Sequence, residues 1–288
     1  GSGFDFYEDS LVAPAGVDVA GAVQRPGGQT LDLLLPWLDR AQAGPFFLFL
    51  HIYEPHAPWE PPEPFKSRYA DPYDGEVATS DAIVGRLLDE LRRRGLYDKA
   101  LVMILADHGE GLRDHGEEYH GILLYREVLH VPLLIKLPGG ARAGERVAAP
   151  VPLGDVTPTL LEAASLPLPK GWAARSLLGR RRAAPVYSET FYPRVHLGWS
   201  ELRSVIDERH HFIESPRAEL YDIAADPRQT KDLVSERPEV TQALRAALGR
   251  FPSGFSGPEA ISSEEMGRLA ALGYLGAAVT GEGPLANP

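Results

Sequence analysis

Apolar residues recur in two alternating patterns along the first part of the chain. Residues 46–52, 101–105 and 132–137 are short continuous apolar runs, which are typical of strands buried on both faces of a parallel sheet. Residues 74–94 instead place apolar side chains on one stripe at helical spacing, and residues 30–43 also predict a helix. Strands that alternate with helices predict an α/β domain with a mostly parallel sheet flanked by helices.

The pattern changes after Pro185, where the apolar runs become shorter and turns separate them. This change predicts a small antiparallel α+β subdomain. We therefore expect an α/β domain over residues 1–183, the antiparallel subdomain over 184–255, and a short helix with a loose tail over 256–288. The remaining expected strands span residues 186–190, 202–207, 211–215 and 219–222, and the remaining expected helices span residues 155–165, 239–248 and 264–272.

The composition excludes several classes of protein. Of the 288 residues, 44% are hydrophobic and 24% are charged, as in ordinary globular proteins. The chain has no cysteine, which excludes disulfides, zinc–thiolate sites, iron–sulfur clusters and a cysteine nucleophile within it. A net charge of -11 argues against nucleic acid as a partner. No apolar run approaches the roughly 20 residues of a membrane span, so we expect no segment that crosses a bilayer.

Polar side chains follow the second apolar run directly. Asp107 and His108 stand at its carboxyl end, and Gly109 comes next, where it lets the backbone turn sharply. Ligands of open α/β sheets bind outside the carboxyl ends of strands. An aspartate and a histidine there offer one oxygen and one nitrogen to a divalent cation. A turn in which the aspartate caps the next segment explains this stretch equally well.

Histidines cluster in the same region. Three of the nine, His108, His115 and His120, lie between residues 108 and 120, which favours anion or metal handling in this loop. His115 taken alone fits a structural role better. His56 follows the first apolar run between two prolines, and an imidazole held so stiffly is a good donor to an oxyanion.

Other polar residues are expected to have no part in a site. Asp74, Glu76 and Asp81 stand at the start of a predicted helix, where carboxylates favour the helix dipole. His210 and His211 lie in a predicted hairpin, so we expect them to face solvent.

Four motifs occur in a fixed order along the chain. They are PFFLFL with PHAP at residues 45–58, YDGEV at 73–77, DHGE through HGE to VPLL at 107–134, and ELYDI with DP and DL at 219–233. Together they resemble the sulfatase family of the alkaline-phosphatase superfamily, over about residues 30 to 275. The resemblance implies an alkaline-phosphatase-like sheet, incomplete at its N-terminal side, and the metal-dependent hydrolysis of sulfuric esters.

The resemblance also implies roles for individual residues. Asp107 and His108 match metal ligands of the family, and His56 and His120 match catalytic residues that contact the sulfate. His120 stands where many relatives have a lysine. The implied ion is Ca²⁺, with Mn²⁺, Mg²⁺ or Zn²⁺ as alternatives. The implied partner is a small-molecule or glycan sulfate ester.

The chain departs from the family at its beginning. Neither the strand with two aspartate ligands nor the C/S-x-P/A-x-R motif, whose first residue becomes the formylglycine nucleophile, is present. We therefore expect the C-terminal portion of a sulfatase, inactive alone, which self-associates or needs a missing N-terminal fragment. Two alternatives are a phosphoesterase or phosphotransferase of the same superfamily and a non-catalytic remnant that acts as a binding module. An upstream signal peptide would imply a periplasmic or secreted location.

Overall fold

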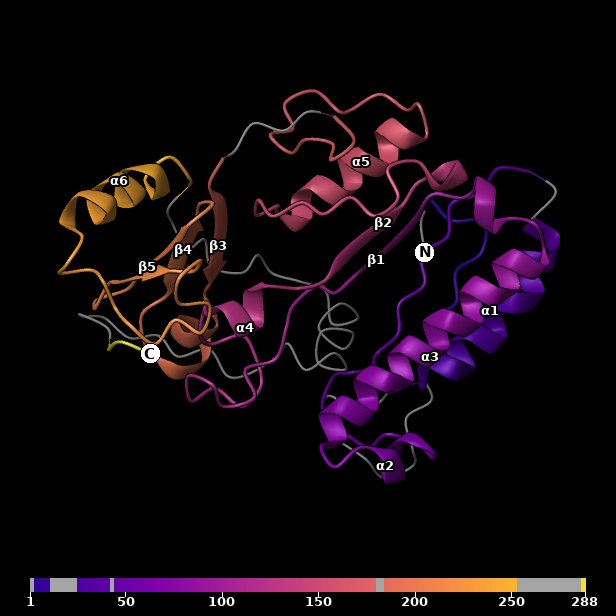
Figure 1. Cartoon of the computed structure of the whole chain (residues 1–288), viewed down its shortest axis with the longest axis horizontal. Coiled ribbons are helices and arrows are strands. Elements are labelled where there is room, and N and C mark those ends of the chain that lie inside the picture. The colour runs from indigo at the N-terminus through magenta and orange to yellow at the C-terminus, as the bar shows by residue number, and fades with distance from the viewer. Residues whose placement is uncertain (1–2, 11–24, 42–43, 180–183, 253–285) are drawn as a thin grey trace. The chain divides into compact units, whose positions relative to one another are not determined.

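The computed structural model divides into two compact units (Figure 1). The first holds the described residues up to Ala100 together with Pro138–Ala141, and the second holds Leu101–Leu137 and the described residues from Arg142 onward. No helix in the described part of the chain is long and apolar enough to cross a membrane. The structure describes residues 3–10, 25–41, 44–179, 184–252 and 286–288.

Two long helices lie side by side in the first unit (Figure 1). Helix α1 spans Gly27–Ala41, and helix α3 spans Pro72–Arg93. Helix α3 begins two residues earlier than predicted, because the side chain of Asp71 accepts from the N–H of Tyr73 at 2.9 Å and caps the helix. The short helix α2 (Phe65–Arg68) and the 3₁₀ turns Tyr97–Lys99 and Pro138–Gly140 complete the regular structure of this unit. The buried side chains that join α1 to α3 are Leu31, Leu34 and Ile83.

The segment 46–52 was predicted as a buried strand, and in the described structure it forms none. Leu48, Leu50 and Ile52 pack against the cluster between α1 and α3, whereas 70% of Phe49 is exposed. A strand needs a neighbouring backbone that takes its hydrogen bonds, and no described segment pairs with this one. Only one side of the segment is therefore covered.

Glu76, in the first turns of α3, is a buried carboxylate. Only 5% of it is exposed, and its Oε1 accepts from the N–H of Glu60 at 3.0 Å. Burial, with the nearby charges of Glu54 and Glu60, raises the pKa of this carboxyl group. The side chain faces inward because the proline-rich loop folds back over the start of the helix.

The second unit begins with a two-stranded sheet. Strand β1 (Val102–Leu105) pairs with β2 (Leu133–Lys136), as predicted, but the two run antiparallel rather than parallel. Parallel strands need a crossover, usually a helix of several turns. The connection here contains only the four-residue helix α4 (Arg126–Leu129), so the chain doubles back. Helix α5 (Val156–Ala163) follows, preceded by the 3₁₀ turn Leu153–Asp155.

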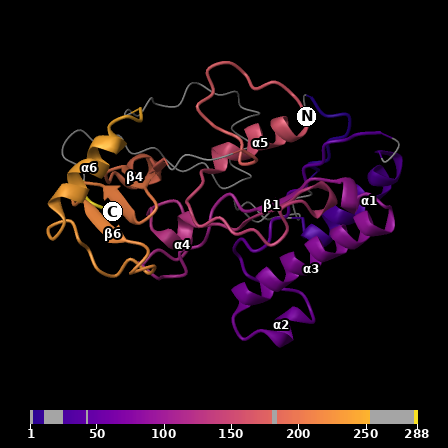
Figure 2. The ribbon, with the colours of Figure 1, turned by 45° about the horizontal axis from the view of Figure 1, so that its top comes forward.

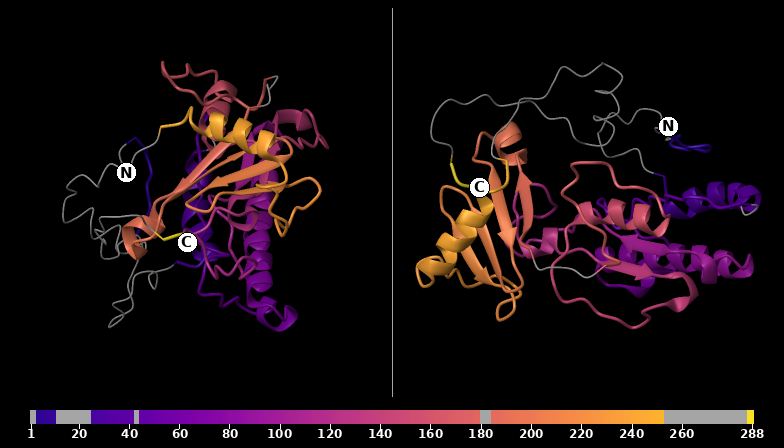
Figure 3. Two further views of the ribbon diagram at one scale, coloured as in Figure 1. Left: turned by 90° about the vertical axis from the view of Figure 1, so that its left-hand side faces the viewer. Right: turned by 90° about the horizontal axis from the view of Figure 1, so that it is seen from above.

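The antiparallel sheet predicted for the C-terminal part of the chain is confirmed. Its four strands lie in the order β3–β4–β5–β6, and every neighbouring pair is antiparallel. Helix α6 (Pro238–Leu248) lies along this sheet (Figures 2 and 3), and its buried Leu244 and Leu248 pack against Val205, Phe212 and Leu220. The strands are β3 (Val186–Thr190), β4 (Leu202–Ile206), β5 (His210–Glu214) and β6 (Glu219–Asp222), with a single π-helical turn at Pro193–Leu197.

The mixed α/β class is thus confirmed, with a separate antiparallel sheet in its C-terminal part. The boundary expected between residues 183 and 184 stays a prediction. The helix predicted over residues 264–272 and the tail after it lie outside the described residues, apart from the last three positions.

Candidate functional site

The candidate site begins where β1 ends, in a turn that two glycines shape. Gly109 donates its N–H to the carbonyl of Val128 at 2.9 Å, so the turn lies directly on the backbone of α4. A Cβ atom on Gly109 would lie 2.0 Å from the carbonyl oxygen of Glu127, and one on Gly111 would lie 2.4 Å from that of Glu117. Such contacts are far closer than atoms allow, so this packing requires glycine at both positions.

A short hairpin follows and returns the chain to the end of β1. Glu117, in its second arm, accepts from the N–H groups of Ile122 and Leu123 at 2.7 and 2.9 Å and so fixes the backbone after His120. The hairpin bonds run from the N–H groups of Gly111, Leu112 and Arg113 to the carbonyls of Tyr119, Glu118 and Glu117, at 2.6, 3.1 and 2.8 Å. As a result the ring of His120 lies against that of His108, with centres 3.7 Å apart.

Asp107 and His108 offer two atoms to one divalent cation. The Asp107 side chain is exposed, and its Oδ1 lies 3.8 Å from Nε2 of His108. The other ring nitrogen of His108, Nδ1, lies 2.9 Å from the carbonyl oxygen of Gly109. Because a carbonyl only accepts, Nδ1 donates to it, which is the orientation seen in histidines that bind a metal through the opposite nitrogen. The chemistry of these two side chains therefore fits a cation.

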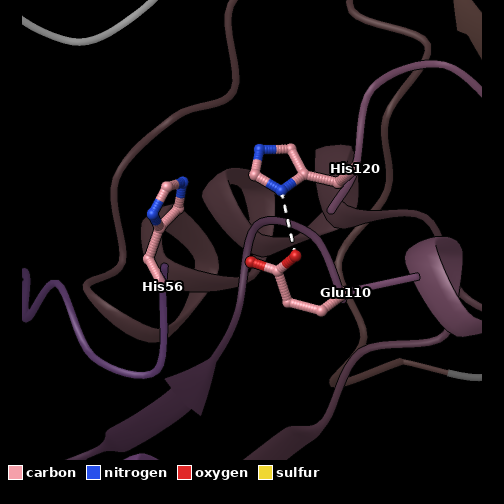
Figure 4. A group of neighbouring side chains, drawn as sticks. All are labelled: His56, Glu110 and His120. Carbon is pink, nitrogen blue, oxygen red and sulfur yellow. Dashed lines mark hydrogen bonds and ion pairs between the residues drawn. The ribbon is translucent and has the colours of Figure 1, made fainter. Parts of the chain in front are cut away.

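A buried carboxylate, Glu110, lies in the turn after β1 and pairs with His120, which follows the hairpin (Figure 4). Only 6% of Glu110 is exposed, and its Oε2 lies 3.4 Å from Nδ1 of His120. Its other oxygen, Oε1, is buried without a hydrogen-bond partner in the described structure. Burying an unpaired carboxylate oxygen is costly, which favours a functional reason for Glu110. The sequence analysis assigned no role to Glu110, although its position two residues after His108 places it in the same candidate site.

His56 belongs to the first unit, within the proline-rich loop. Its Nδ1 lies 2.6 Å from the carbonyl oxygen of Ala57, and its ring lies 4.6 Å from that of Tyr53. Glu54 ties the start of this loop to α1 by accepting from the N–H of Gly27 at 2.8 Å. The loop is thus held on its own unit, and the convergence of His56 with the residues after β1 stays a prediction.

Two other histidines of the second unit lie in largely buried contacts. His115 stacks on Tyr125, and its two nitrogens face Glu127 and Gln229, which agrees with the structural role favoured for it. His211 was expected to face solvent, and this expectation is wrong, because the residue is fully buried. Its strand β5 lies between β4 and β6, and residues on both faces of β5 are covered.

The packing of the turn gives a first expected result. Gly109→Ala should lower the free energy of unfolding by about 2 kcal/mol or more, because the methyl group would overlap the Glu127 carbonyl. Gly85→Ala in α3 is the matched control, since a Cβ at that helical position meets nothing within 4 Å. The control should be stabilised by up to about 1 kcal/mol. Urea unfolding of the three proteins measures both changes, and equal stabilities would contradict the described packing.

Two family models match the chain in overlapping halves. Residues 28–166 match the model described as Sulfatase, and residues 115–251 match N-sulphoglucosamine sulphohydrolase, C-terminal. Among curated proteins, arylsulfatase K of Bos taurus is 30% identical in an alignment of 197 residues, and the match covers 61% of this chain and 35% of the relative. The chain thus spans about a third of the length of the curated relatives that it matches.

Solved structures of similar fold extend this comparison. The phosphonate monoester hydrolase of Agrobacterium radiobacter aligns with a TM-score of 0.66 at 20% identity, over 82% of this chain and 64% of that one. A second protein, solved in complex with its substrate D-glucosamine-2-N,6-O-disulfate, aligns with a TM-score of 0.55 at 23% identity, over 62% of this chain and 39% of that one. At these identities the likeness concerns the fold.

Proposed function

Because the chain belongs to the sulfatase family, we propose that it forms the metal- and sulfate-binding part of a sulfuric ester hydrolase. One observation carries this proposal: the exposed Asp107 and the half-buried His108 meet the Glu110–His120 pair at the end of β1. Cation ligands beside a histidine held by a buried carboxylate are the parts that a site for an anionic ester needs.

Asp107 Oδ1 and His108 Nε2 would hold the divalent cation. When bound, it supplies Lewis-acid stabilisation of the charge that develops on the ester oxygens. Gly109 contributes by accepting from Nδ1 of His108, which directs the opposite nitrogen to the ion. Ca²⁺ takes 6–8 oxygen ligands, so these two side chains alone imply weak affinity, and Mn²⁺, Mg²⁺ and Zn²⁺ are alternative ions.

His120 and His56 would contact the sulfate group. Glu110 accepts from Nδ1 of His120, and Nε2 of that ring would donate to an oxygen of the ester. Nδ1 of His56 lies on the carbonyl of Ala57, and Nε2 of that ring would donate to the sulfate group. Similarity to arylsulfatase K, and to the fold of a protein solved with a disulfated glucosamine, supports a small-molecule or glycan sulfate ester as the substrate class.

Paramagnetic broadening by Mn²⁺ tests the metal site on the full chain. We expect the NMR signals of His108 to broaden with a dissociation constant on the order of 1 mM, since few protein ligands are present. Asp107→Ala should abolish this broadening. Asp114→Ala is the matched control, because it removes another exposed carboxylate seven positions along the same loop. Broadening that is absent from the parent chain, or equal in both variants, would contradict the proposal.

A further inference from the structure

A single buried glutamine joins three segments of the second unit. Only 1% of Gln229 is exposed. Its side-chain oxygen accepts from the N–H of Arg126 at 2.6 Å, and its side-chain nitrogen lies 2.7 Å from Nδ1 of His211. Its backbone is in the left-handed region, with a φ of 53°, which glutamine rarely adopts. Such a conformation persists only where surrounding contacts hold it.

The backbone carbonyl of Gln229 meets His115. Nε2 of His115 lies 3.1 Å from that carbonyl oxygen, and Nδ1 lies 2.5 Å from Oε1 of Glu127. Both partners are acceptors, so the ring satisfies both only when each nitrogen carries a proton. The ring also stacks on Tyr125, with centres 3.8 Å apart and planes 11° apart. His115 is therefore held on two edges and one face.

These contacts lead directly to the candidate site. His115 stands at the tip of the hairpin that begins three residues after His108, at Gly111, and ends just before His120. Glu127, which holds one edge of the His115 ring, has its backbone carbonyl against Gly109 in the turn after β1. One bridge therefore fixes the tip of the hairpin and the surface on which the turn rests.

We infer that His115 is a positioning residue for the site, which clamps the hairpin between Glu127 and the Gln229 carbonyl. Without the clamp, the arm that carries His120 would lose its fixed place beside His108 and Glu110. The expected effect of the clamp on sulfate binding rests on the proposed function. The clamp itself depends only on the contacts of His115.

Amide hydrogen exchange on the full chain tests the clamp without a ligand. In His115→Gln the side-chain amide can reach only one of the two acceptors, so exchange of residues 111–121 should rise about tenfold, while β3–β6 stay protected. Glu127→Gln keeps an acceptor oxygen and should have a smaller effect in the same residues. The exposed His130, outside the bridge, provides the control variant His130→Gln. Exchange that rises equally in the hairpin and in β3–β6 would overturn the inference.

Titration with sodium sulfate, against sodium chloride at equal ionic strength, tests the consequence. The ring signals of His120 should shift in the parent chain, and His115→Gln should weaken sulfate binding about tenfold. Unchanged sulfate affinity in a variant whose hairpin exchanges faster would also overturn the inference, since a merely structural role predicts that result. Failure of sulfate to bind the parent chain would contradict the proposed function, whereas the exchange pattern would still decide whether His115 holds the hairpin.

Discussion

The chain by itself is expected to release no 4-nitrophenol from 4-nitrophenyl sulfate above the uncatalysed rate, with Ca²⁺, Mn²⁺ or Zn²⁺ added. It has no cysteine, and none of its serines stands in a C/S-x-P/A-x-R motif. The remaining nucleophile is water that no described side chain is known to activate. Removing the nucleophile of a catalytic unit typically lowers the rate about a millionfold, although donors and metal ligands are kept.

Parallel assays sharpen this expectation. 4-Nitrophenyl phosphate should also remain uncleaved, which addresses the phosphoesterase alternative with the same preparation. Asp107→Ala is the diagnostic variant, because it removes a proposed metal ligand from an exposed position. Turnover by the parent chain that disappears in this variant would show that the chain carries a complete catalytic site, and would contradict the expectation.

Acid should destabilise the second unit through His211. Complete burial lowers the pKa of this imidazole to about 4, and the hydrogen bond from Gln229 offsets only part of that effect. The folded state therefore favours the neutral ring, while the unfolded chain binds a proton near its ordinary pKa of about 6.5. The stabilisation is complete above pH 6.5 and is lost as the pH falls from 6.5 to about 4, by about 3 kcal/mol in total.

Urea unfolding at pH 7.5, 5.5 and 4.5 measures this loss. His211→Gln removes the titrating group and keeps an acceptor oxygen, so its stability should fall less steeply over the same range. Carboxylates contribute equally to the pH dependence of stability in both proteins. The difference between the two plots of unfolding free energy against pH therefore reports the contribution of His211. His51→Gln is the control, because His51 is exposed in the first unit. Equal slopes in the parent chain and His211→Gln would exclude His211 as the source.

Local patterns were sufficient to predict most of the elements. Strands β3 and β6 have the predicted bounds, and helices α1, α3 and α6 lie within three residues of theirs. Periodicity, capping residues and turn residues act over a few positions, and they stabilise the same segment wherever it lies in the fold. The same holds for Asp107 and His108, whose place after β1 follows from the end of an apolar run and the glycine beside it.

Long-range contacts decided the remaining features. Residues 46–52 carry the apolar pattern of a strand, but pairing requires a second backbone that the pattern does not contain. The antiparallel direction of β1 and β2 depends on how the connection between them folds. His211 lies in β5, which was predicted as a strand within one residue of its observed bounds. The residue is buried because β4 and β6 flank β5 on both sides.

The sequence alone therefore indicated the sulfatase family, and the resemblance supplied two candidate metal ligands and two candidate sulfate donors, which stay predictions. Only the tertiary structure placed Glu110 beside His120 and placed the ring of His115 between Glu127 and the Gln229 carbonyl. Gln229 stands 114 positions after His115 in the chain. No local pattern predicts a contact over that separation, since it forms only when the hairpin and the loop after β6 fold against each other.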